Sequence, residues 1–400
     1  MNNIAKYIIL CLVIAAMLVG FTPAQAADEH ANIFGTVIGD AVIELPVITE
    51  IDYEAGLEQS RATFGKFGCS AIAKTLDDGD TIVGRSFDLF YGNNPAFVIR
   101  TDVDGFYKTV GLAYNTFGGS SFEEIKENGV SYEELLSLLF FTEDIMNEKG
   151  LYLEANMRES QPESTGIVAT TGTNPDAEVS IALPALVRYL GERCATVDEV
   201  VELVQTLNIY GMITDTVKWG GGLLVADATG HYGVFELVDN KFIFIDGQNC
   251  QTNFYLNDEY KDVATIGSGV GRYELLESKI DTVESFSDMT ELMKQVRYTQ
   301  IRDPYNCLFD PCSESTGEGA AYESIGGVLT IEMCKDETIK AQVLASMDEH
   351  GKAENAKPLQ QLKDEGTEWL SVWQTTANCN EQTIHVIFFE DDSLAFDFTV

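Results

Sequence analysis

Residues 69–88 read CSAIAKTLDDGDTIVGRSFD and contain the three side chains that decide how this chain is interpreted. Cys69 opens the stretch, Arg85 follows 16 residues later, and Asp88 follows 19 residues later. A thiol is a good nucleophile once it is deprotonated. An α-amine has an unperturbed pKa of roughly 7.7–8.0, so a Cys69 that becomes N-terminal by cleavage would carry its own general base. We therefore expect Cys69 to be a nucleophile, Arg85 to depress the pKa of its thiol, and Asp88 to orient its amine.

Each of these residues also has a plainer interpretation. Cys69 could be a disulfide or core cysteine, and Arg85 with Asp88 could form a surface ion pair that contributes little to stability. The spacing of the three residues favours an active site over both alternatives.

The first 26 residues have the three parts of a secretory signal peptide. Lys6 precedes the apolar run 7–20, and Ala24-Gln25-Ala26 supplies a small-x-small cleavage site. The apolar run is short and is broken at Thr22-Pro23, so it is a poor membrane span; an uncleaved N-terminal anchor is the alternative. The sequence therefore predicts export to the periplasm or the extracellular space.

Residues 27–68 separate the signal peptide from Cys69. They are either a pro-segment excised at Gly68–Cys69 or an N-terminal arm that packs on the domain. A glycine before the cut would let the thiol approach the preceding carbonyl, because it has no Cβ. The run Val42–Ile48 would suit an edge strand interrupted by Pro46.

Residues 69–400 are long enough for one large domain or two small ones. The formal net charge of −39 argues against nucleic acid and anionic membrane surfaces as partners. Of the 8 cysteines, 6 remain after Cys11 of the signal peptide and Cys69 are set aside, which allows disulfides in an exported protein. The nearest pair is Cys307–Cys312, although buried free thiols are equally compatible. The 4 histidines are scattered and no CxxC motif occurs, so we predict neither a metal nor a cofactor.

Hydrophobic periodicity predicts an α+β fold. Strands are expected at 81–83, 96–100 and 108–112, in a meander over 223–245, and at 369–376, 383–389 and 394–400. Helices are expected at 131–145, where Ser131 and Glu134 form a capping box, at 182–193, after Thr196, and at 271–280 and 287–298. The stretch 303–326 is interpreted as an insertion, a lid or a disulfide-held loop. Runs of strands separated by blocks of helices indicate antiparallel sheets covered by helices.

With Cys69, Arg85 and Asp88 in place, the chain resembles the choloylglycine hydrolase family of N-terminal nucleophile hydrolases, which includes conjugated bile acid hydrolases and penicillin V acylases. Further segments agree in order along residues 69–400. They are Met146–Leu151 with Asn156, Leu186–Val201, Ala226–Gly230 with Val234–Glu236, Thr252-Asn253, Gly271–Tyr273 and Trp369–Phe398.

The resemblance implies a four-layer αββα sandwich with antiparallel sheets. It implies hydrolysis of a linear amide through an acyl-thioester on Cys69, with conjugated bile acids, penicillin V, N-acyl homoserine lactones or other N-acyl amino acids as candidate substrates. Arg85 and Asp88 would support Cys69, Asn156 and Asn253 would lie at the oxyanion, and Arg272 would stabilise the site.

The chain departs from the family pattern in two places. Asn156 lies one residue closer to the preceding turn than the pattern implies. Only 18 residues separate Asn253 from Arg272, where longer relatives insert an assembly hairpin. A homo-oligomer is therefore possible, but the sequence does not predict the tetramer of those relatives. Two other functions are considered beside the hydrolase: an exported binding protein on an inactive scaffold, and an acyltransferase.

Overall fold

The computed structural model describes residues 31–60, 68–90, 94–114, 119–158, 166–168, 170–213, 218–263, 269–297 and 369–400. The predicted signal peptide 1–26, the stretch 303–326 and the pair Cys307–Cys312 lie outside the described residues. No helix among the residues described is both long and apolar enough to cross a membrane.

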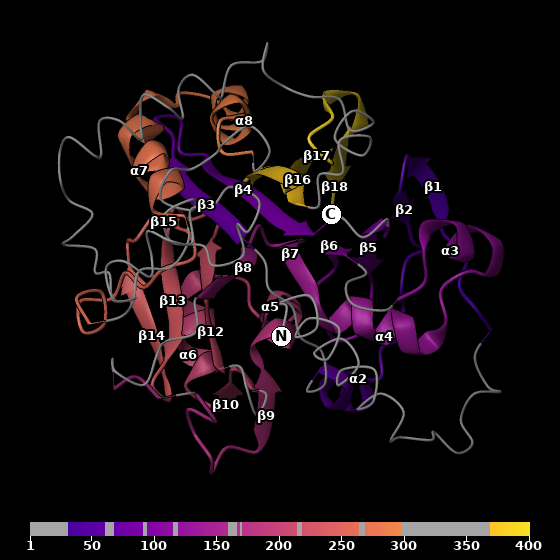
Figure 1. Ribbon diagram of the computed structural model, residues 1–400, viewed down its shortest axis with the longest axis horizontal. Helices are drawn as coiled ribbons and strands as arrows, with labels where there is room; N and C mark the ends of the chain where they lie inside the picture. Colours follow the sequence, from indigo (N-terminus) through magenta and orange to yellow (C-terminus); the bar gives the residue numbers. More distant parts are fainter. Residues whose placement is uncertain are drawn as a thin grey trace, which may run out of the picture.

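Two sheets form the centre of the molecule (Figure 1). The large sheet has the order β1 (Thr36–Gly39), β2 (Val42–Glu44), β5 (Ala96–Thr101), β6 (Thr109–Tyr114), β7 (Thr142–Asn147), β8 (Tyr152–Arg158), β12 (Lys218–Ala226), β13 (Tyr232–Val238) and β14 (Lys241–Asp246), and β11 (Met212–Ile213) pairs with β12. The Cys69 sheet has the order β15 (Cys250–Gln251), β3 (Gly68–Thr75), β4 (Thr81–Phe90), β16 (Trp369–Asn378), β17 (Thr383–Phe388) and β18 (Ala395–Thr399). In the described part of both sheets, every neighbouring pair is antiparallel except β2 with β5.

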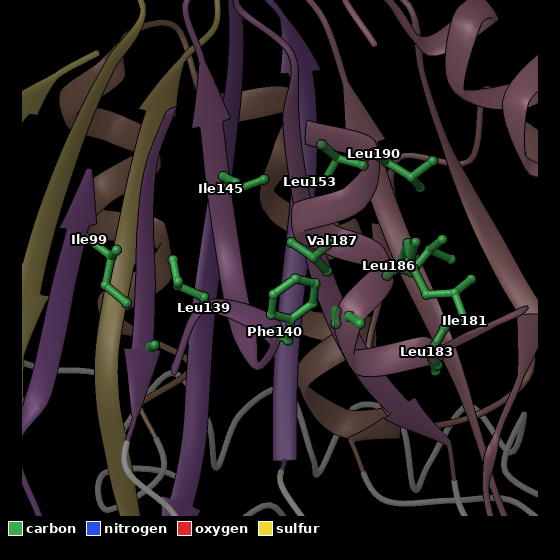
Figure 2. Close-up of a cluster of buried hydrophobic side chains, with 14 of the residues drawn as sticks. Ile99, Leu139, Phe140, Ile145, Leu153, Ile181, Leu183, Leu186, Val187 and Leu190 are labelled. Atoms are coloured by element: carbon green, nitrogen blue, oxygen red, sulfur yellow. The ribbon is translucent and has the colours of Figure 1, made fainter. Parts of the chain in front are cut away.

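Helices cover the outer face of each sheet. The large sheet is covered by α2 (Tyr53–Ser60), α3 (Phe122–Asn128), α4 (Tyr132–Phe140), α5 (Leu183–Gly191) and α6 (Val197–Val204), and the Cys69 sheet is covered by α7 (Val270–Lys279) and α8 (Phe286–Lys294). A small parallel pair, β9 (Val179–Ala182) with β10 (Leu207–Tyr210), flanks α5 and α6. Figure 2 shows apolar side chains of α4 and α5 directed at Ile99, Ile145 and Leu153 of the large sheet.

Three apolar layers therefore separate the sheets and helices: one between the two sheets, and one between each sheet and the helices that cover it. Val98 and Leu112 belong to the core between the sheets, whereas Phe97 and Ile99 belong to the core beneath the helices. Strands that are buried on both faces need continuous apolar runs, which is how Ala96–Ile99 reads. Ile72 and Ile82 pack against α7 and α8. This is a four-layer αββα arrangement, and the predicted α+β class is confirmed.

The predicted helix at 131–145 is too long. The capping box forms as expected, with the Ser131 side chain accepting from the Glu134 backbone, but α4 ends at Phe140. Thr142–Asn147 instead forms β7, and all of its residues are buried between β6 and β8. The helical periodicity of the leucines ends at Leu139, and the pairing of β7 on both sides outweighs the local helical preference of Glu143.

Candidate active site

The spacing of Cys69, Arg85 and Asp88 is the register of one hairpin. Strands β3 and β4 pair so that Cys69 faces Phe87, Ala71 faces Arg85, and Gly68 faces Asp88. Residues directly opposite each other share a face of the sheet, and successive residues alternate between the faces. Cys69 and Arg85 therefore point into the space between the sheets, whereas Asp88 points to the side of α7.

The thiol of Cys69 faces a buried cationic group. Arg85 Nη2 lies 3.6 Å from Cys69 Sγ and donates to the Ala155 carbonyl at 3.0 Å. The guanidinium also stacks over the ring of Phe87, 4.8 Å from its centroid. The Cys69 residue is 0% exposed, so this contact is fully desolvated.

Three carboxylates surround the same guanidinium. Arg85 Nε lies 2.6 Å from Asp144 Oδ1 and 3.3 Å from Glu154 Oε2, and Nη2 lies 3.9 Å from Glu143 Oε2. We call these four residues the Arg85 cluster. The Asp144 contact is a close ion pair and not an aligned hydrogen bond, because Oδ1 has no hydrogen-bond partner. Asp144 is held instead through Oδ2, which accepts from Trp373 Nε1 at 3.0 Å.

One buried cation cannot hold three ionised carboxylates. Burial raises the pKa of Glu143 to about 8 and that of Glu154 to about 7, although Arg85 opposes both shifts. Burial also raises the pKa of Asp144. The pKa of the Cys69 thiol rises for the same reason, against the opposing charge of Arg85. In the uncleaved chain, Cys69 is therefore a neutral thiol at neutral pH.

The backbone of Cys69 is held from the other side. Its N–H donates to Asn253 Oδ1 at 2.9 Å, and its carbonyl accepts from Arg272 Nη1 at 2.7 Å. Arg272 Nη2 donates to the same Asn253 oxygen at 2.9 Å. Asn253 follows β15 and Arg272 lies in the first turn of α7. Both segments are far from Cys69 in the sequence, and both contact its backbone. The Cys69 nitrogen is a peptide nitrogen here, at the position that an α-amine would occupy after a cut at Gly68.

Asp88 contributes through Arg272. Its Oδ2 lies 3.3 Å from Arg272 Nη1, and its Oδ1 accepts from Ser371 Oγ at 2.6 Å and from Ser86 Oγ at 2.8 Å. Burial raises the pKa of Asp88, and Arg272 and the two serines oppose that rise. In the uncleaved chain Asp88 thus orients the arginine that holds the Cys69 carbonyl, and its predicted contact with a freed amine stays a prediction.

Asn156 lies beside the Arg85 cluster, and none of its hydrogen bonds reaches Cys69. Its Nδ2 lies 3.5 Å from the Gln251 carbonyl and 3.4 Å from the Thr252 carbonyl. With the amide oxygen and nitrogen exchanged, the nitrogen donates instead to Glu154 Oε2 at 2.7 Å. The next residue, Met157, uses its carbonyl to accept from Asn253 Nδ2 at 2.9 Å. The structure therefore joins five of the predicted residues through contacts with Cys69 or Arg272: Cys69, Arg85, Asp88, Asn253 and Arg272. The sixth, Asn156, contacts the neighbouring Arg85 cluster.

Sequence reasoning also missed the buried ion pair of Arg158 and Glu236. Arg158 Nη2 lies 3.2 Å from Glu236 Oε1 and donates to Gln251 Oε1 at 2.8 Å, and Arg158 Nη1 donates to the Thr252 carbonyl. These contacts fix the segment that carries Asn253. The signal was present in the sequence, because Glu154, Arg158 and Glu236 interrupt strands that are otherwise largely apolar.

The remaining cysteines of the described chain form no disulfide. Cys194, Cys250 and Cys379 are buried free thiols, and burial raises the pKa of each. Among the residues whose positions are described, no group of three or more His, Cys, Asp or Glu side chains could hold a metal ion.

Comparisons with known proteins find similar solved structures. No family model and no curated protein matches the sequence. A variant of the conjugated bile acid hydrolase from Clostridium perfringens is 13% identical over 83% of this chain and 92% of that chain, with a TM-score of 0.41. A second variant of that enzyme is 14% identical over the same shares, with a TM-score of 0.41. The penicillin V acylase from Agrobacterium tumefaciens is 13% identical over 80% of this chain and 83% of that chain, with a TM-score of 0.35.

Proposed function

We propose that this chain is an N-terminal nucleophile hydrolase of the choloylglycine hydrolase type. It cleaves a linear amide through an acyl-thioester on Cys69. The observation that carries the proposal is the environment of Cys69, whose thiol faces Arg85 while its backbone nitrogen and carbonyl are held by Asn253 and Arg272.

The first stage frees the amine. Cys69 Sγ attacks the Gly68 carbonyl carbon, the Cys69 nitrogen leaves as an amine after taking up the thiol proton, and a thioester forms. Water then hydrolyses the thioester, which releases the Gly68 carboxyl group and restores the thiol. The fixed contacts of the Cys69 backbone favour this attack because they limit the motion of the reacting atoms.

The second stage is turnover. The amine takes the thiol proton, and the thiolate attacks the substrate carbonyl beside the positive charge of Arg85. The resulting ammonium gives its proton to the leaving amine, and water clears the acyl group with the amine as base. Asn253 Oδ1 is positioned to accept from the amine. Asn253 Nδ2 donates one N–H to the Met157 carbonyl, and its second N–H is the donor that an oxyanion role would use; Asn156 is the other candidate for that role.

The direct test is the N-terminal sequence and intact mass of the exported protein. We expect a chain that begins at Cys69, and a Cys69→Ala variant that stays uncut at Gly68. Hydrolysis is then measured on penicillin V, a glycine-conjugated bile acid and an N-acyl homoserine lactone. A wild-type chain that begins near Ala27 and has an unreactive thiol would contradict the proposal and favour a binding protein. Acyl transfer to an added amine in preference to water would indicate an acyltransferase.

Asp88→Asn is expected to lower turnover more than stability. The variant keeps acceptors for the two serines but removes the negative charge that orients Arg272, so we expect a loss of about 10- to 100-fold in kcat. The measurement is kcat beside the thermal midpoint, on protein whose N-terminus has been checked. Asp227→Asn is the matched control, since Asp227 is buried and accepts from Val197 N–H at 2.7 Å away from Cys69. Equal losses of activity and stability in Asp88→Asn would identify a structural ion pair instead.

A further inference from the structure

We infer that residues 31–60 stay bound to the domain after the chain is cut, so that the active protein consists of two chains held without a covalent link. We call residues 31–60 the arm. The inference rests on the proposed cut at Gly68–Cys69, and it concerns what the cut leaves behind. The two alternatives for this segment are then compatible, because the residues are cut from Cys69 like a pro-segment and yet stay packed on the domain like an N-terminal arm.

The arm supplies strands to the large sheet. Strand β2 lies between β1 and β5, and its ladder with β5 is parallel (Figure 1). Hydrogen bonds continue on both sides of the ladder, from Ala96 N–H to the Ala41 carbonyl at 2.8 Å and from Leu45 N–H to the Val98 carbonyl at 3.0 Å. Loss of the arm would leave β5 as an open edge, which is a template for aggregation.

The arm also fills both cores next to that edge. Val42 is 0% exposed and belongs to the core between the sheets, whereas Ile43 and Leu45 are each 2% exposed and belong to the core beneath the helices. Removing buried side chains from a packed core leaves cavities that cost stability in proportion to their volume. A released arm would open such cavities in two layers at once.

Helix α2 anchors the end of the arm that is nearer to the cut. Tyr53 donates its hydroxyl proton to Glu192, and its ring lies 5.0 Å from that of Phe106 and 4.6 Å from the Arg193 guanidinium. Gly56 approaches Phe140 so closely that a Cβ at this position would lie 1.9 Å from the ring. The helix is therefore fitted to α4 and to the turn after α5.

A third contact ties the start of the arm to the domain. Ile33 and Val130 exchange both backbone hydrogen bonds, at 2.8 and 2.7 Å. Residues 31–60 make all of these contacts, and none of the contacts involves Gly68 or the residues that bind Cys69. A cut before Cys69 therefore breaks none of the contacts that hold the arm.

The test uses the processed wild-type protein. Denaturing mass spectrometry is expected to give two chains, one ending at Gly68 and one beginning at Cys69, while gel filtration and native mass spectrometry are expected to give one species that contains both. The chains should separate only in denaturant. A chain that begins at Cys69 and elutes alone, folded and active, would overturn the inference.

An uncut single chain would count against the proposed function and not against the bound arm. In that case, residues 61–67 are replaced with the recognition sequence of a site-specific protease, and the purified protein is cut there. Co-elution of the two pieces supports the inference, and release of the N-terminal piece overturns it.

Tyr53→Ala tests the contacts that are named here. We expect it to speed release of the arm from the processed protein by about tenfold or more, because it removes both the ring packing and the bond to Glu192. Phe34→Ala is the matched control in the same segment, since Phe34 is 60% exposed. The readout is the appearance of free N-terminal fragment at one fixed urea concentration, the same for both variants. Equal release from both variants would contradict the assignment of these contacts to arm binding.

Discussion

Cys69→Ser is expected to abolish amide hydrolysis and to slow or block the cut at Gly68–Cys69. A serine hydroxyl has a much higher pKa than a thiol, so with the same α-amine as its base it is a weaker nucleophile in a site arranged around a thiol. The site offers no compensation, since burial already raises the pKa of the thiol despite the nearby Arg85. We expect the loss in kcat to exceed about 10³-fold. The measurements are acyl-amide hydrolysis, intact mass and N-terminal sequence.

Two further variants make this result specific. Cys69→Ala removes the nucleophile outright and should accumulate only uncut chain. Cys379→Ser changes a second free cysteine that is also 0% exposed, in the same core, and should be processed and active despite some loss of stability. Full hydrolysis by Cys69→Ser, or an uncut Cys379→Ser chain that is still folded, would count against Cys69 as the nucleophile.

The sequence predicts most of the fold because many of its strands have a clear pattern of apolar residues. The strand expected at 81–83 is part of β4, whereas the hairpin with β3, which pairs Gly68 with Asp88, was not predicted. The meander at 223–245 and the closing strands at 369–376 and 383–389 correspond to β12–β14, β16 and β17. β12 with β13, β13 with β14, and β16 with β17 are pairs of consecutive strands, and the period of each strand is visible in its own sequence.

Elements that depend on distant partners were not predictable. Strand β7 was included in a helix because its sheet partners are not visible in its own sequence. In the arm, the edge strand expected within Val42–Ile48 forms as β2 (Val42–Glu44), but its pairing with β5 and its burial beneath the helices depend on distant residues that its own sequence does not identify. The Arg85 cluster was missed for a related reason. Glu143, Asp144 and Glu154 come from two strands, and only the fold brings them to one guanidinium.

Arg85→Met should destabilise the fold strongly at about pH 8 and much less at about pH 5. The variant leaves Glu143, Asp144 and Glu154 buried without their cation. Breaking a buried pair in this way typically costs about 3–5 kcal/mol, because the remaining charge is uncompensated. Protonation of the carboxyls removes that cost. The free energy of unfolding is measured by urea denaturation across this pH range.

The sign of the pH dependence follows from the raised carboxyl pKa values. Glu143, with a pKa of about 8, and Glu154, with a pKa of about 7, bind protons more tightly in the folded chain than in the unfolded chain. Their contribution to stability is therefore fully present below the ordinary carboxyl range and is lost as the pH rises through the folded pKa values. Arg85 opposes both shifts, so its removal raises the two pKa values further and steepens the loss of stability with pH.

A double variant separates charge from packing. Arg85→Met with Glu154→Gln removes one of the uncompensated carboxyls, and we expect it to recover part of the lost stability at about pH 8 and little at about pH 5. Arg85 also stacks on Phe87 and lies 5.8 Å from the ring centroid of Trp373, so a loss through packing alone is a real alternative. Such a loss would be the same at both pH values and would not respond to Glu154→Gln. The charge of Arg85 therefore has two separable consequences, because it offsets the buried carboxylates of the large sheet and also faces the thiol of the Cys69 sheet.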